Sequence, residues 1–287
     1  MEWISKSEIM IVGLGLMGGS YARALHHLGF HVSAIDRDAE AISYALENGI
    51  IDHGFTQPDP EALKSADAVI FALYPGVFLD WIRENQHHLK PGAMLTDVTG
   101  VKTCIVYDVQ ALLRPDVEFI AAHPMAGREV YGVRNSSERI FRDANFIVVP
   151  TDKNTQVAID WCASLGKLLG FRRISVLSPE EHDEMIGFVS QLTHVIAVAL
   201  MTCSENGHLV DYTGDSFRDL TRIAHINETM WSELFLRNRE PLLRQMDTFI
   251  AEMQTLRTLL ADGDKAGLEE KMRLSTERRA LFDKKKN

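Results

Sequence analysis

The most constraining feature of this chain is the run of residues 9–18, Ile-Met-Ile-Val-Gly-Leu-Gly-Leu-Met-Gly. Its apolar first half is typical of a buried strand, and residues 20–28 are typical of a helix. In such a unit Gly13 permits a tight turn, Gly15 lets a phosphate approach the backbone, and Gly18 lets the helix pack closely on the strand. The amino end of the helix then faces the phosphate charge. The run predicts a dinucleotide site, although a glycine turn without a ligand has the same spacing.

A second apolar segment, residues 32–35, ends at Asp36, 21 residues beyond Gly15. That spacing suits a carboxylate that binds the adenosine ribose. A carboxylate repels a 2′-phosphate, so Asp36 favours NAD over NADP, while the neighbouring Arg37 keeps NADP open as an alternative. The residues that we expect to contact the cofactor are Gly13, Gly15, Leu16, Met17, Gly18, Asp36 and Arg37, with Leu73 and Tyr74 after a later strand.

The composition is that of a globular enzyme, with 46% hydrophobic and 24% charged residues. The formal net charge of −10 argues against a nucleic-acid surface, which needs a basic stripe. Cys104, Cys162 and Cys203 form no CxxC pair, which favours free thiols in a reducing cytoplasm. No signal peptide precedes the first strand, and no uncharged apolar run reaches the roughly 18 residues that cross a bilayer. We therefore expect a cytoplasmic protein without a nucleic-acid or membrane partner.

Apolar segments continue to alternate with helical ones. The further strands that we expect are residues 68–72, 94–96, 118–122, 146–149 and 174–177, with a helix at residues 155–169 among them. This alternation predicts an α/β fold, a Rossmann-type doubly wound parallel sheet with helices on both faces.

The pattern changes at Ser178-Pro179-Glu180-Glu181, which is typical of a capping box with proline at the first helical position. Beyond it the sequence predicts only helices, at residues about 180–206, 227–261 and 264–283. We therefore expect a dinucleotide-binding domain at residues 1–178 and an all-helical dimerisation and substrate domain at residues 179–287.

Residues 185–201 are apolar on nearly every side of the expected helix, which indicates burial all round. A helical region of this size buries such a helix most easily against a second copy of itself. We expect a homodimer with interdigitated helices. The alternative is a monomer in which the sheet covers this helix.

Chemistry is expected beyond the carboxyl ends of the strands. Two polar clusters follow strands there, residues 97–102 and residues 123–129. His123 is the better candidate for a base, because Pro124 keeps it extended and an imidazole with a pKa near neutral can take a proton from an alcohol. Position alone fits a structural histidine equally well. The paired histidines at residues 26–27 and 87–88 lack the spacing of a metal site, so we expect no metal.

The chain resembles prephenate and arogenate dehydrogenases over nearly its whole length. The segments that carry this resemblance are Gly-Leu-Gly-Leu-Met-Gly-Gly-Ser at residues 13–20, residues 97–102, His-Pro-Met-Ala-Gly at residues 123–127, Ser-Gln-Leu-Thr-His at residues 190–194, and residues 217–224 with Met230-Trp231. The resemblance implies oxidative decarboxylation of prephenate, or of its amino analogue arogenate, in tyrosine biosynthesis. It also implies the interdigitated helical dimer.

By motif position the resemblance makes His123 the proton acceptor, places His194 near the substrate, and gives Arg222 the role of binding a substrate carboxylate. A guanidinium suits that role because its planar fork accepts a carboxylate in a bidentate way. Gly100 stands where the family usually has a serine that contacts the substrate hydroxyl, and Thr99 or a water is the expected substitute.

Two further departures concern substrate preference. Gln191 stands where the family often has histidine, and Arg128 adds a second cation beside the His-Pro-Met-Ala-Gly segment. A hydroxyacid dehydrogenase or imine reductase remains a rival, but it normally uses a lysine that residues 179–206 lack. A dinucleotide-sensing regulator would not need His123 and Arg222 together.

Overall fold

The computed structural model describes residues 3, 7–128 and 130–282, and divides the chain into two compact units, residues 1–238 and 239–287. The first unit contains a six-stranded parallel sheet with the order β3-β2-β1-β4-β5-β6. Its strands are β1 (Glu8–Val12), β2 (His31–Ile35), β3 (His53–Phe55), β4 (Ala68–Phe71), β5 (Met94–Asp97) and β6 (Glu118–Phe119). The short β3 was not predicted from the sequence. The strand order reverses between β1 and β4, which is where doubly wound sheets bind their ligands.

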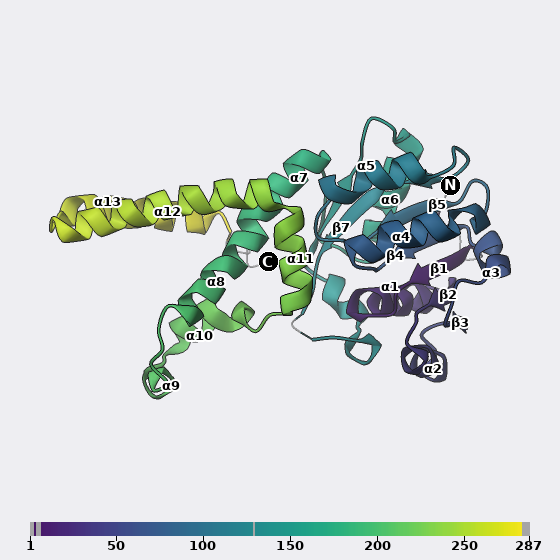
Figure 1. The fold of residues 1–287 in the computed structure, drawn as a ribbon, viewed down its shortest axis with the longest axis horizontal. Coiled ribbons are helices and arrows are strands. Elements are labelled where there is room, and N and C mark those ends of the chain that lie inside the picture. The colour runs from purple at the N-terminus through teal and green to yellow at the C-terminus, as the bar shows by residue number, and fades with distance from the viewer. Residues whose placement is uncertain (1–2, 4–6, 129, 283–287) are drawn as a thin grey trace. The chain divides into compact units, whose positions relative to one another are not determined.

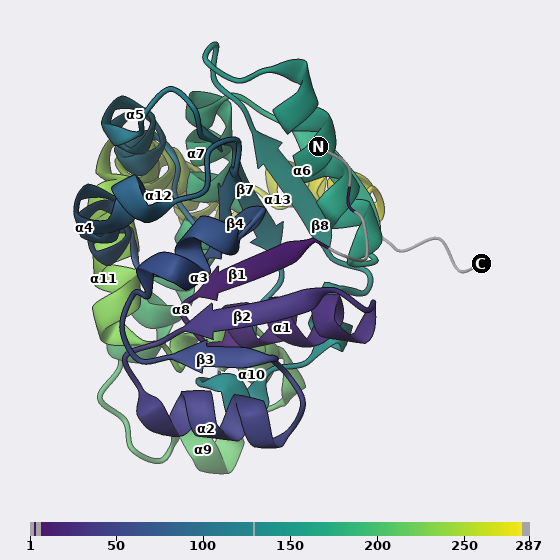
Figure 2. The ribbon, with the colours of Figure 1, turned by 90° about the vertical axis from the view of Figure 1, so that its right-hand side faces the viewer.

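Helices cover both faces of this sheet (Figures 1 and 2). They are α1 (Leu16–His27), α2 (Ala39–Glu47), α3 (Pro60–Ser65), α4 (Pro75–Asn85) and α5 (Thr103–Leu112), with a 3-10 turn η1 (Gln86–His88). Alternate residues of β1 enter different cores, because successive side chains of a strand point to opposite faces. Ile9 and Ile11 pack with α1 and α2, whereas Met10 and Val12 pack with α3, α4 and α5. The predicted doubly wound sheet is confirmed.

The strand predicted at residues 118–122 is not one strand of that sheet. It divides at Ile120 into β6 and β7 (Ala121–Met125), and β7 enters a second sheet with β8 (Asn145–Val149) and β9 (Arg173–Val176). β7 runs antiparallel to β8, which corrects the expectation of parallel strands throughout. The segment between β7 and β8 contains two 3-10 turns, η2 (Val133–Asn135) and η3 (Glu138–Phe141), and α6 (Gln156–Leu168) then leads to β9, parallel to β8. His123 therefore lies in a strand of the second sheet and not at the end of a strand of the first.

The helical region of the first unit begins with the predicted capping box. The Ser178 hydroxyl accepts from Glu181 N, and the Glu181 carboxylate accepts from Ser178 N. The elements that follow are α7 (Pro179–Ile186), a π-helix η4 (Gly187–Leu192), α8 (Thr193–Thr202), α9 (Leu209–Tyr212), α10 (Asp215–Thr221), a 3-10 turn η5 (Arg222–Ala224) and α11 (Glu228–Arg237). The helix predicted at residues 180–206 thus ends at Thr202 and changes its winding in the middle.

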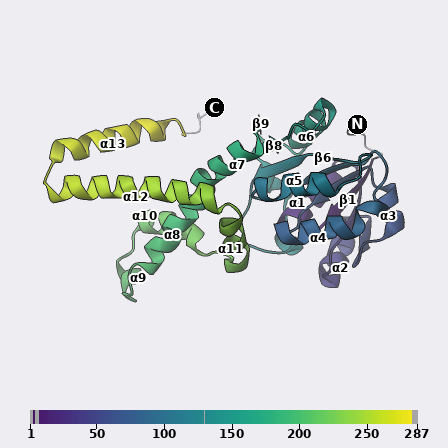
Figure 3. The ribbon, with the colours of Figure 1, turned by 45° about the horizontal axis from the view of Figure 1, so that its top comes forward.

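The second unit is a hairpin of two helices, α12 (Arg239–Ala261) and α13 (Lys265–Ala280), which lie side by side (Figure 3). The predicted break at Asp262-Gly263 separates them, and Gly263 adopts a φ of +67°. The helix predicted at residues 227–261 is two helices, α11 and α12, which belong to different compact units.

The helical stretch Pro179–Thr202 is long and apolar enough to cross a membrane by length and composition. This corrects the expectation that no such run exists, because Ser, Gln, Thr and His interrupt the apolar residues without adding formal charge. Only 28% of its most apolar window is buried in the single chain, so the predicted burial on every side is not achieved within one chain.

Candidate active site

The glycine turn after β1 has the geometry that a dinucleotide needs. Gly13 has a φ of +98°, and a Cβ there would lie 2.5 Å from the Ala72 carbonyl oxygen. A Cβ on Gly18 would overlap the Gly13 carbonyl, whereas one on Gly15 would meet nothing within 4 Å. Gly13 and Gly18 are therefore required by packing, and Gly15 leaves the amino end of α1 open. That end, from Leu16 and Met17 onward, has no side-chain cap and no acidic residue in its first turn, so its N–H groups suit a phosphate.

Asp36 lies beside this turn. Its Oδ2 accepts from Leu14 N at 2.5 Å and its Oδ1 accepts from Asp38 N at 2.8 Å, which fixes the carboxylate at the carboxyl end of β2. Arg37 next to it is exposed. Leu73 and Tyr74 follow β4, and Leu73 Cδ2 lies 3.1 Å from where a Gly13 Cβ would be. These residues would hold a nicotinamide dinucleotide at the β1–β4 switch point.

His123 lies in β7 and is half-buried. Its Nδ1 lies 2.9 Å from Nε2 of His182 in α7, and Nδ1 of His182 lies 2.8 Å from Oδ1 of Asp183. Asp183 also accepts from Lys102 N and Thr103 N, both at 2.9 Å, and from the Thr103 hydroxyl at 2.5 Å. We call His123, His182 and Asp183 the His–His–Asp row.

Beneath the row lies a buried ion pair. Lys102 Nζ binds Asp97 Oδ2 at 2.7 Å and the Ala122 carbonyl at 2.6 Å, and Asp97 Oδ1 accepts from Ala122 N at 3.1 Å. Both charged side chains are fully buried. The pair joins the end of β5 to the residue before His123, so it fixes the backbone next to the candidate base. The polar cluster at residues 97–102 is therefore mostly internal.

The Thr99 hydroxyl donates into this network, with the Asp97 carboxylate and the Val101 carbonyl as acceptors. Thr99 is 5% exposed. Its hydroxyl is therefore already hydrogen-bonded inside the buried network. The geometry gives no support to the expectation that Thr99 replaces the family serine.

Burial, together with the nearby charges of His182 and Lys102, holds the pKa of His123 well below its ordinary value. Burial also lowers the pKa of His182, against the opposing influence of Asp183. Burial by itself raises the pKa of Asp183, but hydrogen bonds from His182 and Thr103 outweigh it and keep that pKa below its ordinary value. At neutral pH both imidazoles are neutral and Asp183 is ionised, so His123 is ready to accept a proton.

Helix α11 connects this base to the expected substrate residues. A Cβ on Gly100 would lie 3.7 Å from Leu234 Cδ1 and 3.9 Å from His123 Cε1, so Gly100 borders the base. One turn earlier on α11, the Trp231 ring stacks on His194, with centroids 3.6 Å apart. His194 Nδ1 lies 2.9 Å from the Ser190 carbonyl oxygen.

Gln191 is buried and has a structural role. Its amide donates to the Leu234 carbonyl at 3.1 Å, and its oxygen accepts from Asn238 at 2.7 Å. Asn238 also donates to the Asp183 carbonyl at 2.9 Å. Gln191 therefore joins η4 to α11 rather than presenting a polar group to a substrate.

The two candidate cations for a substrate carboxylate are exposed and come from different segments. Arg222 begins η5, which packs against α8, the helix of His194. Arg128 lies in the segment after β7. The contacts described for these residues do not bring either arginine against His123.

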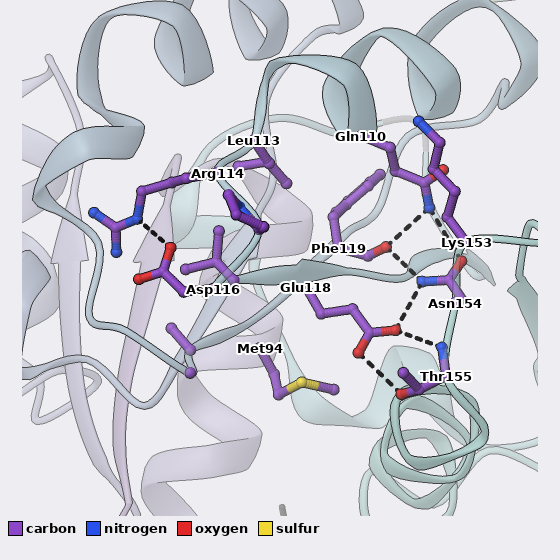
Figure 4. A pocket seen from close by; sticks show the side chains of 14 residues that line it. Met94, Gln110, Leu113, Arg114, Asp116, Glu118, Phe119, Lys153, Asn154 and Thr155 are labelled. Carbon is purple, nitrogen blue, oxygen red and sulfur yellow. Dashed lines mark hydrogen bonds and ion pairs between the residues drawn. The ribbon is translucent and has the colours of Figure 1, made fainter.

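A hollow of about 420 Å³ lies at the other end of the sheet, where β5 and β6 begin (Figure 4). One of its two acidic residues, Glu118, accepts from Thr155 N at 2.7 Å and from the Thr155 hydroxyl at 2.9 Å. Arg114 binds Asp116 at 2.7 Å and the Leu89 carbonyl at 2.6 Å. These side chains hold the loops and the start of α6 in place. His123 is therefore a better candidate for catalysis than the residues of this hollow.

His182 and Asp183 were not predicted from the sequence. A signal existed, because Pro179, His182, Asp183 and Ile186 are the buried positions of α7 and their spacing marks one helical face. Two adjacent polar residues on a buried face of an amphipathic helix call for partners. What the sequence lacked was the partner, since His123 is 59 positions away.

An open glycine turn in a doubly wound sheet, together with a neutral histidine beside Gly100 in the segment after β5, is typical of a dinucleotide-dependent dehydrogenase. Residues 21–175 match the family described as prephenate dehydrogenase, nucleotide-binding domain, and residues 178–274 match prephenate dehydrogenase, dimerization domain. The chain therefore belongs to the prephenate dehydrogenase family, as the sequence motifs indicated. The nucleotide-binding domain of this family agrees with the open glycine turn after β1.

Relatives with known names agree with this assignment. The chain is 31% identical over 271 residues to prephenate dehydrogenase of Bacillus subtilis, covering 92% of this chain and 72% of the relative. It is 30% identical to cyclohexadienyl dehydrogenase of Zymomonas mobilis, covering 90% of both. The crystal structure of Aquifex aeolicus prephenate dehydrogenase in complex with hydroxyphenyl propionate and NAD+ superposes with a TM-score of 0.89 at 29% identity, covering 98% of this chain and 100% of that one.

Proposed function

We propose that this chain oxidatively decarboxylates prephenate to 4-hydroxyphenylpyruvate, with NAD as hydride acceptor, as a step of tyrosine biosynthesis. The observation that carries the proposal is the neutral, half-buried His123, which lies next to Gly100 in the segment after β5, a strand of the sheet that holds the glycine turn. A base in this place can take the proton of a ring hydroxyl while the carbon that bears it is oxidised.

Prephenate carries a ring hydroxyl, a ring carboxylate para to it and a pyruvyl side chain. His123 Nε2 accepts the hydroxyl proton, and the hydride of the same carbon leaves to the acceptor that NAD would supply. The carbon that bears the hydroxyl becomes a carbonyl. The bond to the para carboxylate then breaks, its electron pair enters the ring, and CO2 leaves. The resulting phenolate takes its proton back from His123, so the base is regenerated. Aromatisation of the ring drives the step.

The substrate carries two anions, of which one departs as CO2. We assign the retained side-chain carboxylate to Arg222, with His194 beside the substrate and Arg128 as a second cation. A clamp on the retained carboxylate orients the ring without holding the departing group. Gly100 leaves space next to His123 in which a water or the substrate itself can lie.

Arogenate, which has an amino group in the side chain, is the alternative substrate. Relatives include a cyclohexadienyl dehydrogenase and a probable arogenate/prephenate dehydrogenase of Methanocaldococcus jannaschii. Both substrates share the ring chemistry, so they differ only at the side-chain end of the site. The choice between them therefore lies with the residues around Arg222 and Arg128.

The assembly and the domain division are part of the same proposal. We propose a homodimer through the helices beyond residue 178, and a functional boundary between residues 1–178 and 179–287. The match of residues 178–274 to a dimerization domain supports both. The proposed location is the cytoplasm, where free cysteines stay reduced.

The test is NADH absorbance with prephenate and with arogenate, each with NAD and with NADP. The expected result is the highest kcat/KM with prephenate and NAD. As a control, His123→Asn should lower kcat by about 10²- to 10⁴-fold with NAD affinity unchanged. Faster turnover of arogenate would favour the alternative, and absence of turnover with both would reject the proposed reaction.

A further inference from the structure

We infer that His182 and Asp183 are positioning residues of this reaction: they fix the tautomer of His123 and hold the charge of the transferred proton until the product takes it back. This inference rests on the proposed function for its kinetic consequences. The tautomer itself is a property of the enzyme without substrate.

The direction of each hydrogen bond follows from Asp183. Oδ1 accepts from Lys102 N and lies against His182 Nδ1, while Oδ2 accepts from Thr103 N and its hydroxyl. An ionised carboxylate only accepts, so His182 Nδ1 carries the proton and His182 Nε2 is an acceptor. His123 Nδ1 must then donate to it, which leaves His123 Nε2 with a free lone pair. With two neutral rings, the row has this single arrangement.

The acidic end of the row is fixed by α5. Lys102 is the N-cap of that helix and Thr103 its first residue, so two backbone N–H groups of the amino end bind the carboxylate. The helix N-terminus favours a negative charge at this place. Asp183 is 1% exposed, so water does not compete for it. The carboxylate therefore holds His182 in one orientation.

The charges around the row suit temporary storage of a proton. The charged or titratable groups that face His123 and His182 are Asp183 from α7, and Asp97 and Lys102 from the end of β5 and the turn after it. Lys102 and Asp97 neutralise each other at 2.7 Å, so Asp183 supplies the remaining charge. When His123 takes the hydroxyl proton, its Nδ1–H bond to His182 stays in place and Asp183 balances the new positive charge. The phenolate then recovers the proton, so none needs to leave the buried site.

The first test compares two changes at the same carboxylate. Asp183→Asn removes the charge and lets an amide N–H oppose His182, whereas Thr103→Val removes one hydrogen bond and keeps the charge. Asp183→Asn should lower kcat by at least about 10²-fold, with KM within about threefold, and move the acid limb of kcat/KM to lower pH. Thr103→Val should stay within a few-fold of the parent. Equal losses in both variants would reduce Asp183 to a packing role and overturn the inference.

The second test changes the middle of the row. Gln at position 182 offers an amide oxygen to His123 Nδ1, whereas Leu offers none. His182→Gln should therefore retain at least tenfold more kcat than His182→Leu, at similar thermal stability and NAD affinity. Equal activity of the two variants at equal stability would overturn the assigned hydrogen bond.

Nitrogen-15 NMR of histidine-labelled enzyme separates this inference from the proposed reaction. The signal of His123 is found by comparison with His123→Asn. The expected result without substrate is a neutral ring with a proton on Nδ1 and a free Nε2. Asp183→Asn should change that pattern. A proton on Nε2 in the parent would refute the row, whatever the substrate proves to be.

Discussion

Gly100 leaves room beside the imidazole of His123 that a side chain could occupy. A Cβ there would make ordinary contacts with Leu234 and His123, and the backbone has no positive φ. We expect Gly100→Ala to stabilise the fold by about 0.4–1 kcal/mol, because it reduces the freedom of the unfolded chain. Gly100→Ser should fold equally well and keep kcat within about tenfold of the parent while it changes KM for the substrate. Urea unfolding and steady-state kinetics check both, and loss of folding in Gly100→Ala would contradict the open space.

Substitution of Arg222 tests whether the substrate is a diacid. A charge-assisted bond to a carboxylate contributes roughly 1.5–3 kcal/mol, or about ten- to 150-fold in binding. Arg222→Ala should raise KM for prephenate at least tenfold with a smaller effect on kcat, since the clamp holds ground and transition states alike. Arg222→Lys should recover only part of the loss, because lysine lacks the planar fork. An unchanged KM in Arg222→Ala, with a raised KM in Arg128→Ala, would move the clamp to the segment after β7.

At the scale of elements, two glycines of the strand–turn–helix unit of β1 and α1 have different roles, one in folding and one in cofactor binding. Gly18→Ala places a methyl group against the Gly13 carbonyl, whereas Gly15→Ala enters open space at the amino end of α1. We therefore expect Gly18→Ala to lower the thermal midpoint markedly. Gly15→Ala should keep that midpoint and weaken NAD binding, because its methyl group occupies the phosphate approach. Calorimetry of unfolding and of NAD binding measures the two effects, and unchanged NAD affinity in Gly15→Ala would remove the turn from cofactor binding.

The π-helix between α7 and α8 is a second informative feature at the scale of elements. Its wider winding lies between His182 and Asp183 on one side and His194 on the other. Such segments are frequent at functional sites. Here Gln191 in the π-helix is turned inward to bind the Leu234 carbonyl and Asn238, which ties the helix of the row to α11. Gln191 therefore has a structural role, although it lies between His182 and His194 along the chain.

At the scale of the whole molecule, the single chain leaves apolar surface exposed on both units. The exposed side chains include Phe188, Val189 and Met201 in the first unit, and Ile250, Met253 and Leu260 in the second. Patches of this kind mark interaction surfaces. We expect a dimer that persists at nanomolar concentration, because separation would expose this surface to water. Fluorescence-detected sedimentation measures it, and a well-folded monomer at that concentration would contradict the homodimer.

Charged substitutions on the apolar surface of α12 test where the dimer interface lies. Ile250→Glu with Met253→Glu places two charges on an exposed face of α12 and should shift the species towards monomer. A matched control, Glu252→Gln, changes a residue that already binds Lys271 across the hairpin at 2.8 Å and should leave the dimer intact. Dimers of unchanged stability in the double variant would place the interface away from α12.

The parts of this protein that depend on neighbours in sequence were predictable. The glycine turn, Asp36 at the end of the second strand and the capping box at Ser178 each involve residues a few positions apart or a repeated spacing, so local sterics and periodicity determine them. The doubly wound order follows from alternating strands and helices for the same reason. The short β3 could not be predicted, because a strand of three residues is too short to show an alternation of apolar and polar residues.

Tertiary structure alone decided the pairing of distant polar groups. His123 meets His182 across 59 positions, and Thr103 meets Asp183 across 80. Lys102 and Thr99 looked like residues of an open polar cluster, yet the end of β5 and β7 enclose them, because a buried Asp97 requires partners. The antiparallel entry of β7 into the second sheet likewise has no local signal. The sequence by itself determined the glycine turn with Asp36 beside it and predicted His123 as a base, whereas the fold decided which groups contact that histidine, since burial and hydrogen-bond satisfaction are properties of the packed chain.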